Sequence, residues 1–227
     1  MQKPLLIALD RDGTIIPDAE YLGKDPNWRS QLRIYADAIQ GLKLLKNSLN
    51  NKDYKIVVIT NQSGVARGYF SCKTIEEINQ ELDTKLKKES IEIDSWHYCP
   101  YVTLEYAEEK NLQKNNPWVR KTDLRKPGIG MLHQAAKSFG KSLEDFSVYV
   151  IGDKIEDVLT GLNANGSGIL IKRRDNKYFN PEIWKKLRAK YNLRTYKSIS
   201  MIDAILKVLK EQDLETIIVS RDSSSHL

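Results

Sequence analysis

Residues 5–14 of the chain read LLIALDRDGT, an apolar run followed by two aspartates, a glycine and a threonine. A short apolar run bounded by turn residues is typical of a strand buried on both faces of a parallel sheet. Carboxylates at the end of such a strand cost free energy unless a cation or hydrogen bonds compensate them. Asp10 and Asp12 therefore indicate a site with a nucleophile, a proton donor and a hard divalent metal. A plain turn at Asp12-Gly13 is the alternative that this segment alone leaves open.

The composition is that of a globular domain. The chain has 227 residues, of which 41% are hydrophobic and 29% are charged. No apolar stretch approaches the roughly 18 residues that span a bilayer, and the N-terminal apolar run reads as a strand rather than a signal peptide. Two cysteines, Cys72 and Cys99, offer no disulfide framework, so we expect a cytoplasmic protein without a membrane partner.

Excess positive charge lies in the C-terminal part of the chain. The formal net charge is +6, and residues 166–227 hold 13 Lys and Arg against 7 Asp and Glu. Such a basic face attracts phosphate groups, from those of sugar phosphates to those of nucleic acids. A solvated helix face is the simpler interpretation of the same charges.

Strand-like and helix-like runs alternate along the chain, which indicates βαβ units. We expect strands at 5–9, 54–60, 91–98, 147–151 and 168–171, and helices at 37–49, 74–88, 130–139, 155–163, 181–191 and 201–210. Thr74, with Glu77 three residues later, is expected to cap its helix. The predicted fold is α/β, a Rossmann-like, doubly wound parallel sheet with helices on both faces. We expect residues 1–212 to form a single domain without a large cap domain, and residues 213–227 to add an edge strand at 214–219 and a flexible tail.

Polar residues follow three of the expected strands at the point where each strand ends. Asp10 and Asp12 follow the first strand, a Thr-Asn-Gln-Ser run (60–63) ends the second, and Asp153 follows the strand at 147–151. Because the carboxyl ends of parallel strands meet at one edge of a sheet, the three aspartates should converge there. Oxygen ligands alone select Mg²⁺, which also relieves the repulsion between the carboxylates.

Two further charged residues are candidates for the same site. Asp157 lies four residues after Asp153, on the same face of the following helix, where it can hold a metal-bound water or a lysine. A helix carboxylate favoured by the dipole is an equal alternative for Asp157. Lys126 precedes a helix and can neutralise a nucleophile and a phosphate, although alone it reads as a surface lysine.

Together these segments resemble the haloacid dehalogenase (HAD) superfamily of phosphatases. Asp10-Arg11-Asp12-Gly13-Thr14 matches its first motif, Thr60 its second, Lys126 its third, and residues 152–157 (GDKIED) its fourth. TNQSGVARGYF (60–70), HYCP (97–100) and RKPGIGML (125–132) are similar to the D-glycero-D-manno-heptose 1,7-bisphosphate phosphatases. The related histidinol phosphatases share much of this pattern.

The resemblance implies a role for each matching residue. Asp10 attacks phosphorus and becomes an aspartyl phosphate, and Asp12 protonates the leaving oxygen and later activates water. Asp10, the Asp12 backbone carbonyl and Asp153 hold Mg²⁺, while Thr60 and Lys126 bind the phosphoryl oxygens. Asp157 contacts the groups that hold the metal and the phosphate rather than holding either directly. The candidates for substrate contact are Asn61, Gln62, Ser63, Arg67, Arg125 and Lys154.

The chain departs from these relatives at a structural zinc site after the third strand. Their pattern is Cys-Pro-His, then Cys-x-Cys just before Arg-Lys-Pro. Here Cys99 and Pro100 remain, but Tyr101, Thr122 and Leu124 occupy the other ligand positions, so we expect no zinc. The loop at 101–121 must then be held by packing, with Trp118 and Tyr106 as its anchors, or stay mobile.

Three functions remain open at this point. The first is a phosphatase for a small phosphorylated sugar, most of all a heptose bisphosphate, with a histidinol phosphatase as a close variant. The second is a polynucleotide 3′-phosphatase, because those enzymes share the DxDGT, TNQ-x-G and RKP features and the C-terminal part is basic. The third is a pseudoenzyme that only binds a phosphorylated ligand, which the intact set of motif residues disfavours.

Overall fold

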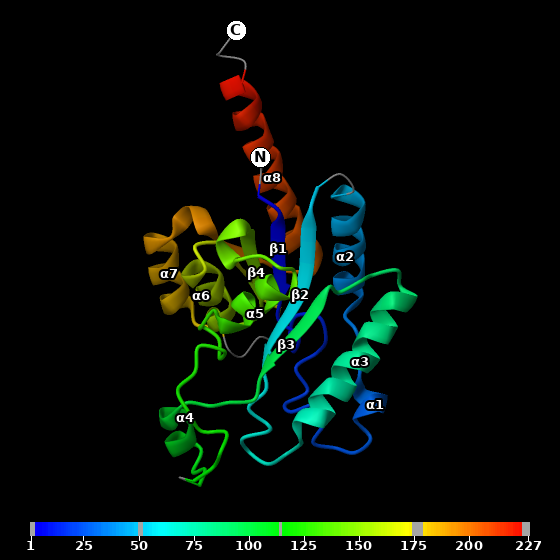
Figure 1. Cartoon of the computed structure of the whole chain (residues 1–227), viewed down its shortest axis with the longest axis vertical. Coiled ribbons are helices and arrows are strands. Elements are labelled where there is room, and N and C mark those ends of the chain that lie inside the picture. The colour runs from blue at the N-terminus through cyan, green and yellow to red at the C-terminus, as the bar shows by residue number, and fades with distance from the viewer. Residues whose placement is uncertain (1–2, 50–51, 114, 174–178, 224–227) are drawn as a thin grey trace.

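The computed structural model describes residues 3–49, 52–113, 115–173 and 179–223 (Figure 1). Its centre is a six-stranded sheet in the order β3-β2-β1-β4-β5-β6, in which every paired neighbour is parallel. The strands are β1 (Leu5–Leu9), β2 (Tyr54–Asn61), β3 (Ser95–Cys99), β4 (Ser147–Gly152), β5 (Ser167–Ile171) and β6 (Thr195–Ser198). The predicted doubly wound parallel sheet is confirmed.

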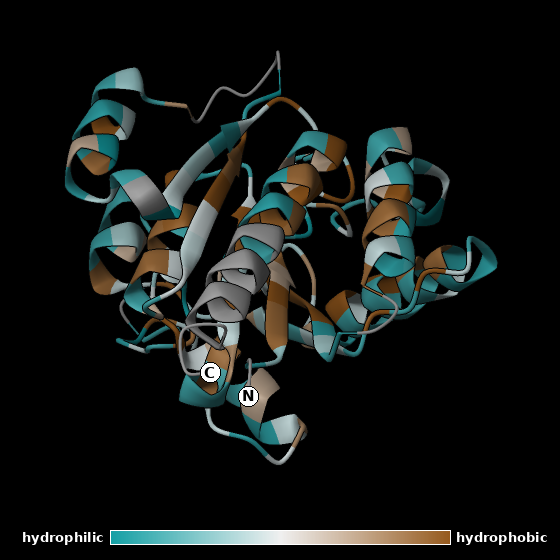
Figure 2. Ribbon diagram, turned by 90° about the horizontal axis from the view of Figure 1, so that it is seen from above, coloured by the Kyte–Doolittle hydropathy of each residue, from teal (hydrophilic) through white to brown (hydrophobic). Residues whose placement is uncertain are grey.

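Helices cover both faces of this sheet (Figure 1). They are α1 (Trp28–Gln31), α2 (Ala36–Ser48), α3 (Cys72–Lys88), α4 (Leu104–Glu109), α5 (Gly130–Ser138), α6 (Ile155–Asn163), α7 (Pro181–Lys190) and α8 (Met201–Ser223), with short 3₁₀ turns at Leu143–Asp145 and Asn192–Arg194. Many of these helices alternate between hydrophobic and hydrophilic stretches, as Figure 2 shows. None of the helices in the described ranges is long and apolar enough to cross a membrane.

The central strand β1 explains how the layers are held together. All five of its residues are buried. Leu5, Ile7 and Leu9 pack in the cluster that includes α2, α3 and α8, whereas Leu6 and Ala8 pack in the cluster on the other face, with α5. This alternation follows from the period of two along a strand, and it is why the run is apolar at every position.

The register of the sheet determines where the strand-end residues lie. Leu9 is paired with Val58 of β2 and with Ile151 of β4. The residues after these positions therefore emerge at one edge, which is the edge where parallel α/β sheets bind ligands.

The structure corrects the sequence reading in several places. Residues 214–219, expected as an edge strand, continue helix α8, because no glycine or proline interrupts the helical pattern after Lys210. The rest of the expected tail, 224–227, lies outside the described residues. Helix α3 is capped by Ser71, whose Oγ accepts the Thr74 backbone N–H at 3.3 Å, rather than by Thr74. Strand β6 and helix α4 were not expected from the sequence pattern.

Candidate active site

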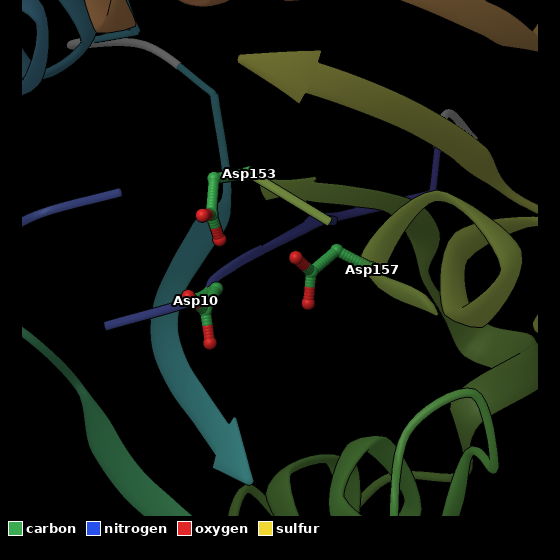
Figure 3. A group of neighbouring side chains, drawn as sticks. All are labelled: Asp10, Asp153 and Asp157. Carbon is green, nitrogen blue, oxygen red and sulfur yellow. The ribbon is translucent and has the colours of Figure 1, made fainter. Parts of the chain in front are cut away.

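Three buried carboxylates gather where the central strands end. Asp10 follows β1, Asp153 follows β4, and Asp157 comes from the first turn of α6. Each offers an oxygen within 4.8 Å of the others, and the three side chains face a common point in Figure 3. Carboxylates this close repel each other strongly in a buried site, so the arrangement needs positive charge to balance it.

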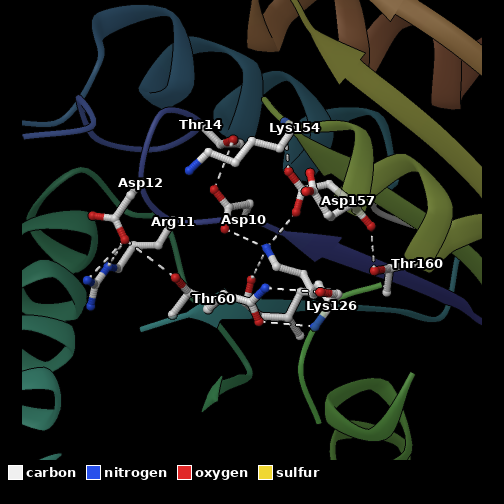
Figure 4. A network of polar contacts seen from close by, with 12 residues as sticks. Asp10, Arg11, Asp12, Thr14, Thr60, Lys126, Lys154, Asp157 and Thr160 are labelled. Atoms are coloured by element: carbon white, nitrogen blue, oxygen red, sulfur yellow. Dashed lines mark hydrogen bonds and ion pairs between the residues drawn. The ribbon is translucent and has the colours of Figure 1, made fainter. Parts of the chain in front are cut away.

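Lys126 supplies positive charge from the loop before α5. Its Nζ lies 2.6 Å from Asp10 Oδ1 and 2.5 Å from Asp157 Oδ1, and it also donates to the Ile59 carbonyl at 3.0 Å (Figure 4). The side chain is only 3% exposed. Asn61, at the end of β2, holds the Lys126 backbone at both ends, accepting from its N–H at 3.0 Å and donating to its carbonyl at 3.2 Å. Asn61 therefore fixes the lysine loop, in addition to lining the cavity in front of it.

Asp157 combines the two roles that the sequence left open. Its Oδ2 accepts the Lys154 backbone N–H at 2.9 Å, which caps α6, while Oδ1 pairs with Lys126. The side chain fits because Gly152 lies beside it, where an added Cβ would be 2.1 Å from Asp157 Oδ2. The GDKIED motif thus requires glycine at its first position, because the Asp157 side chain lies against the Gly152 backbone.

The electrostatics of the carboxylates follow from their burial. Burial raises the pKa of Asp10 to about 6, although Lys126 acts in the opposite direction. Burial, with Asp10 and Asp157 nearby, raises the pKa of Asp153 to about 8. For Lys126, burial alone would lower the pKa, but the attraction of Asp10 and Asp157 raises it well above the ordinary lysine value. The lysine therefore keeps its charge inside the protein.

The donor set fits a hard divalent cation. Asp10, Asp153 and Asp157 offer only carboxylate oxygens, which suit Mg²⁺ rather than zinc. Gly13 borders the group with a φ of +87°, and a Cβ there would lie 2.3 Å from Asp153 Oδ2. Within the described ranges of the chain, this triad is the one cluster of acidic, histidine and cysteine side chains with the spacing of a metal site.

The Asp12 carboxylate points away from Asp10. Its Oδ2 accepts from Gln62 Nε2 at 2.8 Å, from Thr60 Oγ1 at 3.4 Å, and from Nε of the neighbouring Arg11 at 3.1 Å. Figure 4 shows the Asp12 side chain turned toward Arg11. The structure therefore adds Asp157 to the predicted carboxylate cluster and leaves the Asp12 side chain outside it. The predicted metal contact through the Asp12 backbone carbonyl stays a prediction.

Two cavities open in front of these groups. One of about 380 Å³ includes Asp10, Thr60, Arg125 and Lys126 in its lining. The other, of about 240 Å³, includes Asp12, Gln62 and Tyr21. Three of the predicted substrate contacts, Asn61, Ser63 and Lys154, line both cavities.

Arg67 is held by two tyrosines that the sequence did not link to it, Tyr21 and the expected loop anchor Tyr106. Its Nε donates to the Tyr106 hydroxyl at 3.0 Å, and its guanidinium lies 5.1 Å from the Tyr21 ring centroid. The Tyr106 hydroxyl in turn donates to Ser63 Oγ at 3.1 Å. No spacing signal in the sequence links these residues, because Tyr21 and Tyr106 come from separate segments.

Arg173 is a second residue that the sequence reasoning missed. It follows β5, and its guanidinium donates to the Gly13 carbonyl at 3.3 Å and to the Thr14 carbonyl at 3.2 Å. It also pairs with Asp37 at 3.0 Å. The sequence offered one signal for Arg173, which is that it comes just after an expected strand and belongs to the basic C-terminal part of the chain.

The loop at 101–121, next to the positions where the relatives carry zinc ligands, is held by packing and hydrogen bonds. Cys99 is buried, and its Sγ lies 3.7 Å from the Tyr101 carbonyl, while Thr122 Oγ1 accepts from the Leu124 N–H at 3.2 Å. Tyr106 and Trp118, the two expected anchors, pack against a small cluster of buried apolar residues. The expectation that the protein holds no zinc stays a prediction.

Known proteins resemble this chain in sequence and in fold. The D-glycero-beta-D-manno-heptose-1,7-bisphosphate 7-phosphatase of Haemophilus influenzae is 33% identical over 158 residues, which are 70% of this chain and 76% of that protein. The Escherichia coli K12 protein of the same name is 32% identical over 177 residues, 78% of this chain and 82% of its own length.

Solved structures share the fold over almost the whole chain. A D,D-heptose 1,7-bisphosphate phosphatase from B. bronchiseptica, complexed with magnesium and phosphate, has a TM-score of 0.63 at 23% identity, covering 91% of this chain and 99% of that one. A HAD-like phosphatase structure from Mesorhizobium loti has a TM-score of 0.60 at 24% identity, covering 90% and 88%.

Fold, carboxylate site and relatives together define a HAD-like phosphatase. Residues 5–166 match the family described as polynucleotide kinase 3 phosphatase, and the chain belongs to that family.

Proposed function

We propose that this phosphatase uses Mg²⁺ to hydrolyse a phosphomonoester of a small phosphorylated sugar, with D-glycero-D-manno-heptose 1,7-bisphosphate as the favoured substrate. The sugar is supported by the 7-phosphatases that are 32% and 33% identical to this chain. The chemistry is carried by one observation, the buried contact of 2.6 Å between Lys126 Nζ and Asp10 Oδ1. A buried, charged lysine opposes the effect of burial and favours the anionic form of the neighbouring carboxylate, which is the form a nucleophile needs.

Asp10 then forms a bond with phosphorus as the bond from phosphorus to the sugar oxygen breaks. Asp12 gives its proton to that oxygen, so that a neutral alcohol leaves. In the second half of the reaction water attacks the phosphorus of the aspartyl phosphate, Asp12 takes a proton from the water, and inorganic phosphate and the free Asp10 carboxylate result. Thr60 and Lys126 donate to the phosphoryl oxygens in both halves.

Asp10, Asp153 and the Asp12 backbone carbonyl would hold Mg²⁺, with Asp157 close by. When bound, the ion neutralises charge on the phosphoryl group. Arg125 and Lys154 line the cavity beside Asp10 and supply positive charge for the rest of a phosphorylated sugar. The cavities of about 380 and 240 Å³ suit a small substrate better than a large one. A cytoplasmic location stays a prediction that rests on the two free cysteines.

A 3′-phosphorylated polynucleotide is the second candidate substrate, because the family match carries that description. The deciding test is Mg²⁺-dependent phosphate release from both heptose 1,7-bisphosphate anomers, histidinol phosphate, other sugar phosphates and a 3′-phosphorylated oligonucleotide. We expect a heptose bisphosphate to be turned over most efficiently, and Asp10→Asn to abolish turnover while the fold remains. Turnover of the oligonucleotide alone would overturn the sugar assignment, and normal rates in Asp10→Asn would overturn the mechanism.

A further inference from the structure

Arg11 lies between Asp10 and Asp12 in the sequence but points into the protein. It is completely buried. A guanidinium taken out of water costs free energy unless each of its donor groups finds a partner. The hydrogen-bond partners of the Arg11 guanidinium therefore indicate what this buried arginine does.

The Arg11 donors connect Asp12 to helix α3. Nε and one terminal nitrogen of Arg11 both contact Asp12 Oδ2 at 3.1 Å, and the other terminal nitrogen donates to Asn79 Oδ1 at 2.7 Å. Asn79 is 6% exposed and is the one polar side chain among the buried residues of α3, which are otherwise Ile75, Ile78, Leu82 and Leu86. An asparagine in that position costs stability unless it serves a partner, and its partner is Arg11.

All the hydrogen bonds that the structure gives the Asp12 carboxylate meet at one oxygen. Oδ2 accepts from Arg11, Gln62 and Thr60. An oxygen surrounded by donors cannot itself carry a proton, so a protonated Asp12 bears its proton on Oδ1. Asp12 also borders both cavities of the site.

We propose that Arg11, held in place by Asn79, is a positioning residue that makes Asp12 Oδ1 the oxygen which delivers the proton to the leaving group. This inference rests on the proposed function, in which Asp12 is the general acid. In the step, the proton moves from Asp12 Oδ1 to the bridging oxygen while the phosphorus–oxygen bond breaks. Neither Arg11 nor Asn79 is among the residues that line the two cavities, so both act through Asp12.

The leaving group separates this role from a merely structural one. A sugar alcohol is a poor leaving group that needs the proton, whereas p-nitrophenolate leaves without one. A change that only loosens the fold lowers turnover of both substrates in parallel. A change that misplaces the acid lowers kcat/KM for the sugar phosphate alone, because kcat/KM reports the steps up to the departure of the leaving group and not the later hydrolysis of the aspartyl phosphate.

The test compares kcat/KM on a sugar phosphate and on p-nitrophenyl phosphate. Asn79→Leu, which keeps the size of the side chain, and Arg11→Lys, which keeps the charge but not the planar fork, should each lose at least about tenfold on the sugar phosphate and less than about twofold on p-nitrophenyl phosphate. Ile78→Ala, on the same buried face of α3, is the matched control and should leave the ratio of the two values unchanged.

Asp12→Asn distinguishes the failure of this inference from that of the proposed function. If Asp12→Asn changes the ratio but Asn79→Leu and Arg11→Lys do not, the positioning role is wrong and Asp12 remains the acid. If Asp12→Asn leaves the ratio unchanged, or if the wild-type protein turns over neither substrate, the proposed function fails and the inference fails with it. A crystal structure of Asn79→Leu provides a second readout, in which an unmoved Asp12 carboxylate would overturn the role of Asn79.

Discussion

Replacing Asp157 by asparagine removes a charge from the buried site and leaves the size of the side chain unchanged. Asp157 is 1% exposed, and its Oδ1 lies 2.5 Å from Lys126 Nζ. The amide oxygen of the substituted side chain could still accept the Lys154 N–H and cap α6. The Asp157→Asn substitution therefore tests the ion pair with Lys126 more than it tests the cap.

The magnitude follows from the distance and the surroundings. Two unit charges at the 2.5 Å separation seen here attract each other by about 7 kcal/mol at an effective dielectric constant of about 20. Much of that attraction offsets the desolvation of both charges, and Lys126 keeps Asp10 and the Ile59 carbonyl as partners. Breaking a buried pair on one side costs about 3–5 kcal/mol. We expect a loss of about 3 kcal/mol, a large part of a typical stability of about 5–15 kcal/mol.

The assay is urea unfolding of the wild type and of Asp157→Asn at neutral pH, followed by circular dichroism. Asp145→Asn is the matched control, because Asp145 Oδ2 accepts the Ser142 N–H at 2.8 Å in an exposed cap with no buried lysine. The reasoning would be refuted if Asp157→Asn lost no more stability than the control. A Lys126→Met background adds a second check, since the cost of Asp157→Asn should shrink there.

Three other outcomes are expected. Gly13→Ala should weaken Mg²⁺ binding in calorimetric titrations and lower stability by about 1 kcal/mol or more, because φ is +87° and the new Cβ would lie 2.3 Å from Asp153 Oδ2; normal affinity would contradict this. Arg173→Gln should reduce kcat on a sugar phosphate severalfold by releasing the backbone carbonyls after β1, whereas Arg188→Gln, which also loses bonds to backbone carbonyls, should not. Burial lowers the pKa of His97 below 6.5, so the unfolded chain binds a proton first and the free energy of unfolding should fall as the pH drops through 6.5; a pH series on the wild type and His97→Gln should show a smaller fall in the variant.

The fold could be predicted because the decisive signals were local. An apolar strand such as Leu5–Leu9 is legible from its composition alone, and strand ends then fall at one edge by the rules of parallel sheets. The short strand β6 was missed because its sequence, TYKS, is polar. It lies at an edge of the sheet, so it lacks the apolar run that marks a strand buried on both faces. The end of α8 was predicted as a strand because the run LETIIV (214–219) contains β-branched residues, which favour strands. Extending a helix that has already formed costs little free energy, and this outweighs the local preference of those residues.

The site residues at the strand ends could be predicted from the sequence, but the long-range contacts between them and other elements could not. Asp10 and Asp153 are visible in the sequence because each follows an apolar run. The bond between Arg11 and Asn79 joins residues 68 positions apart. Helical spacing places Asn79 on the buried face of α3 with Ile75 and Leu82, but it does not say that an arginine meets it there. Such pairings depend on tertiary packing, which a single sequence does not display.

The local charges explain why a lysine alone does not complete the site. Asp10, Asp153 and Asp157 bring three negative charges when ionised, while Lys126 and Lys154 bring two positive ones. Lys126 is already shared between two carboxylates, so with Asp153 also ionised a phosphate dianion arriving beside Asp10 would meet a site with one net negative charge. A divalent cation held by the carboxylates would reverse that sign and turn repulsion into attraction. Burial, together with the charges of Asp10 and Asp157, raises the pKa of Asp153 when no cation balances it. The three carboxylates thus prepare the site for a metal and through it for phosphate.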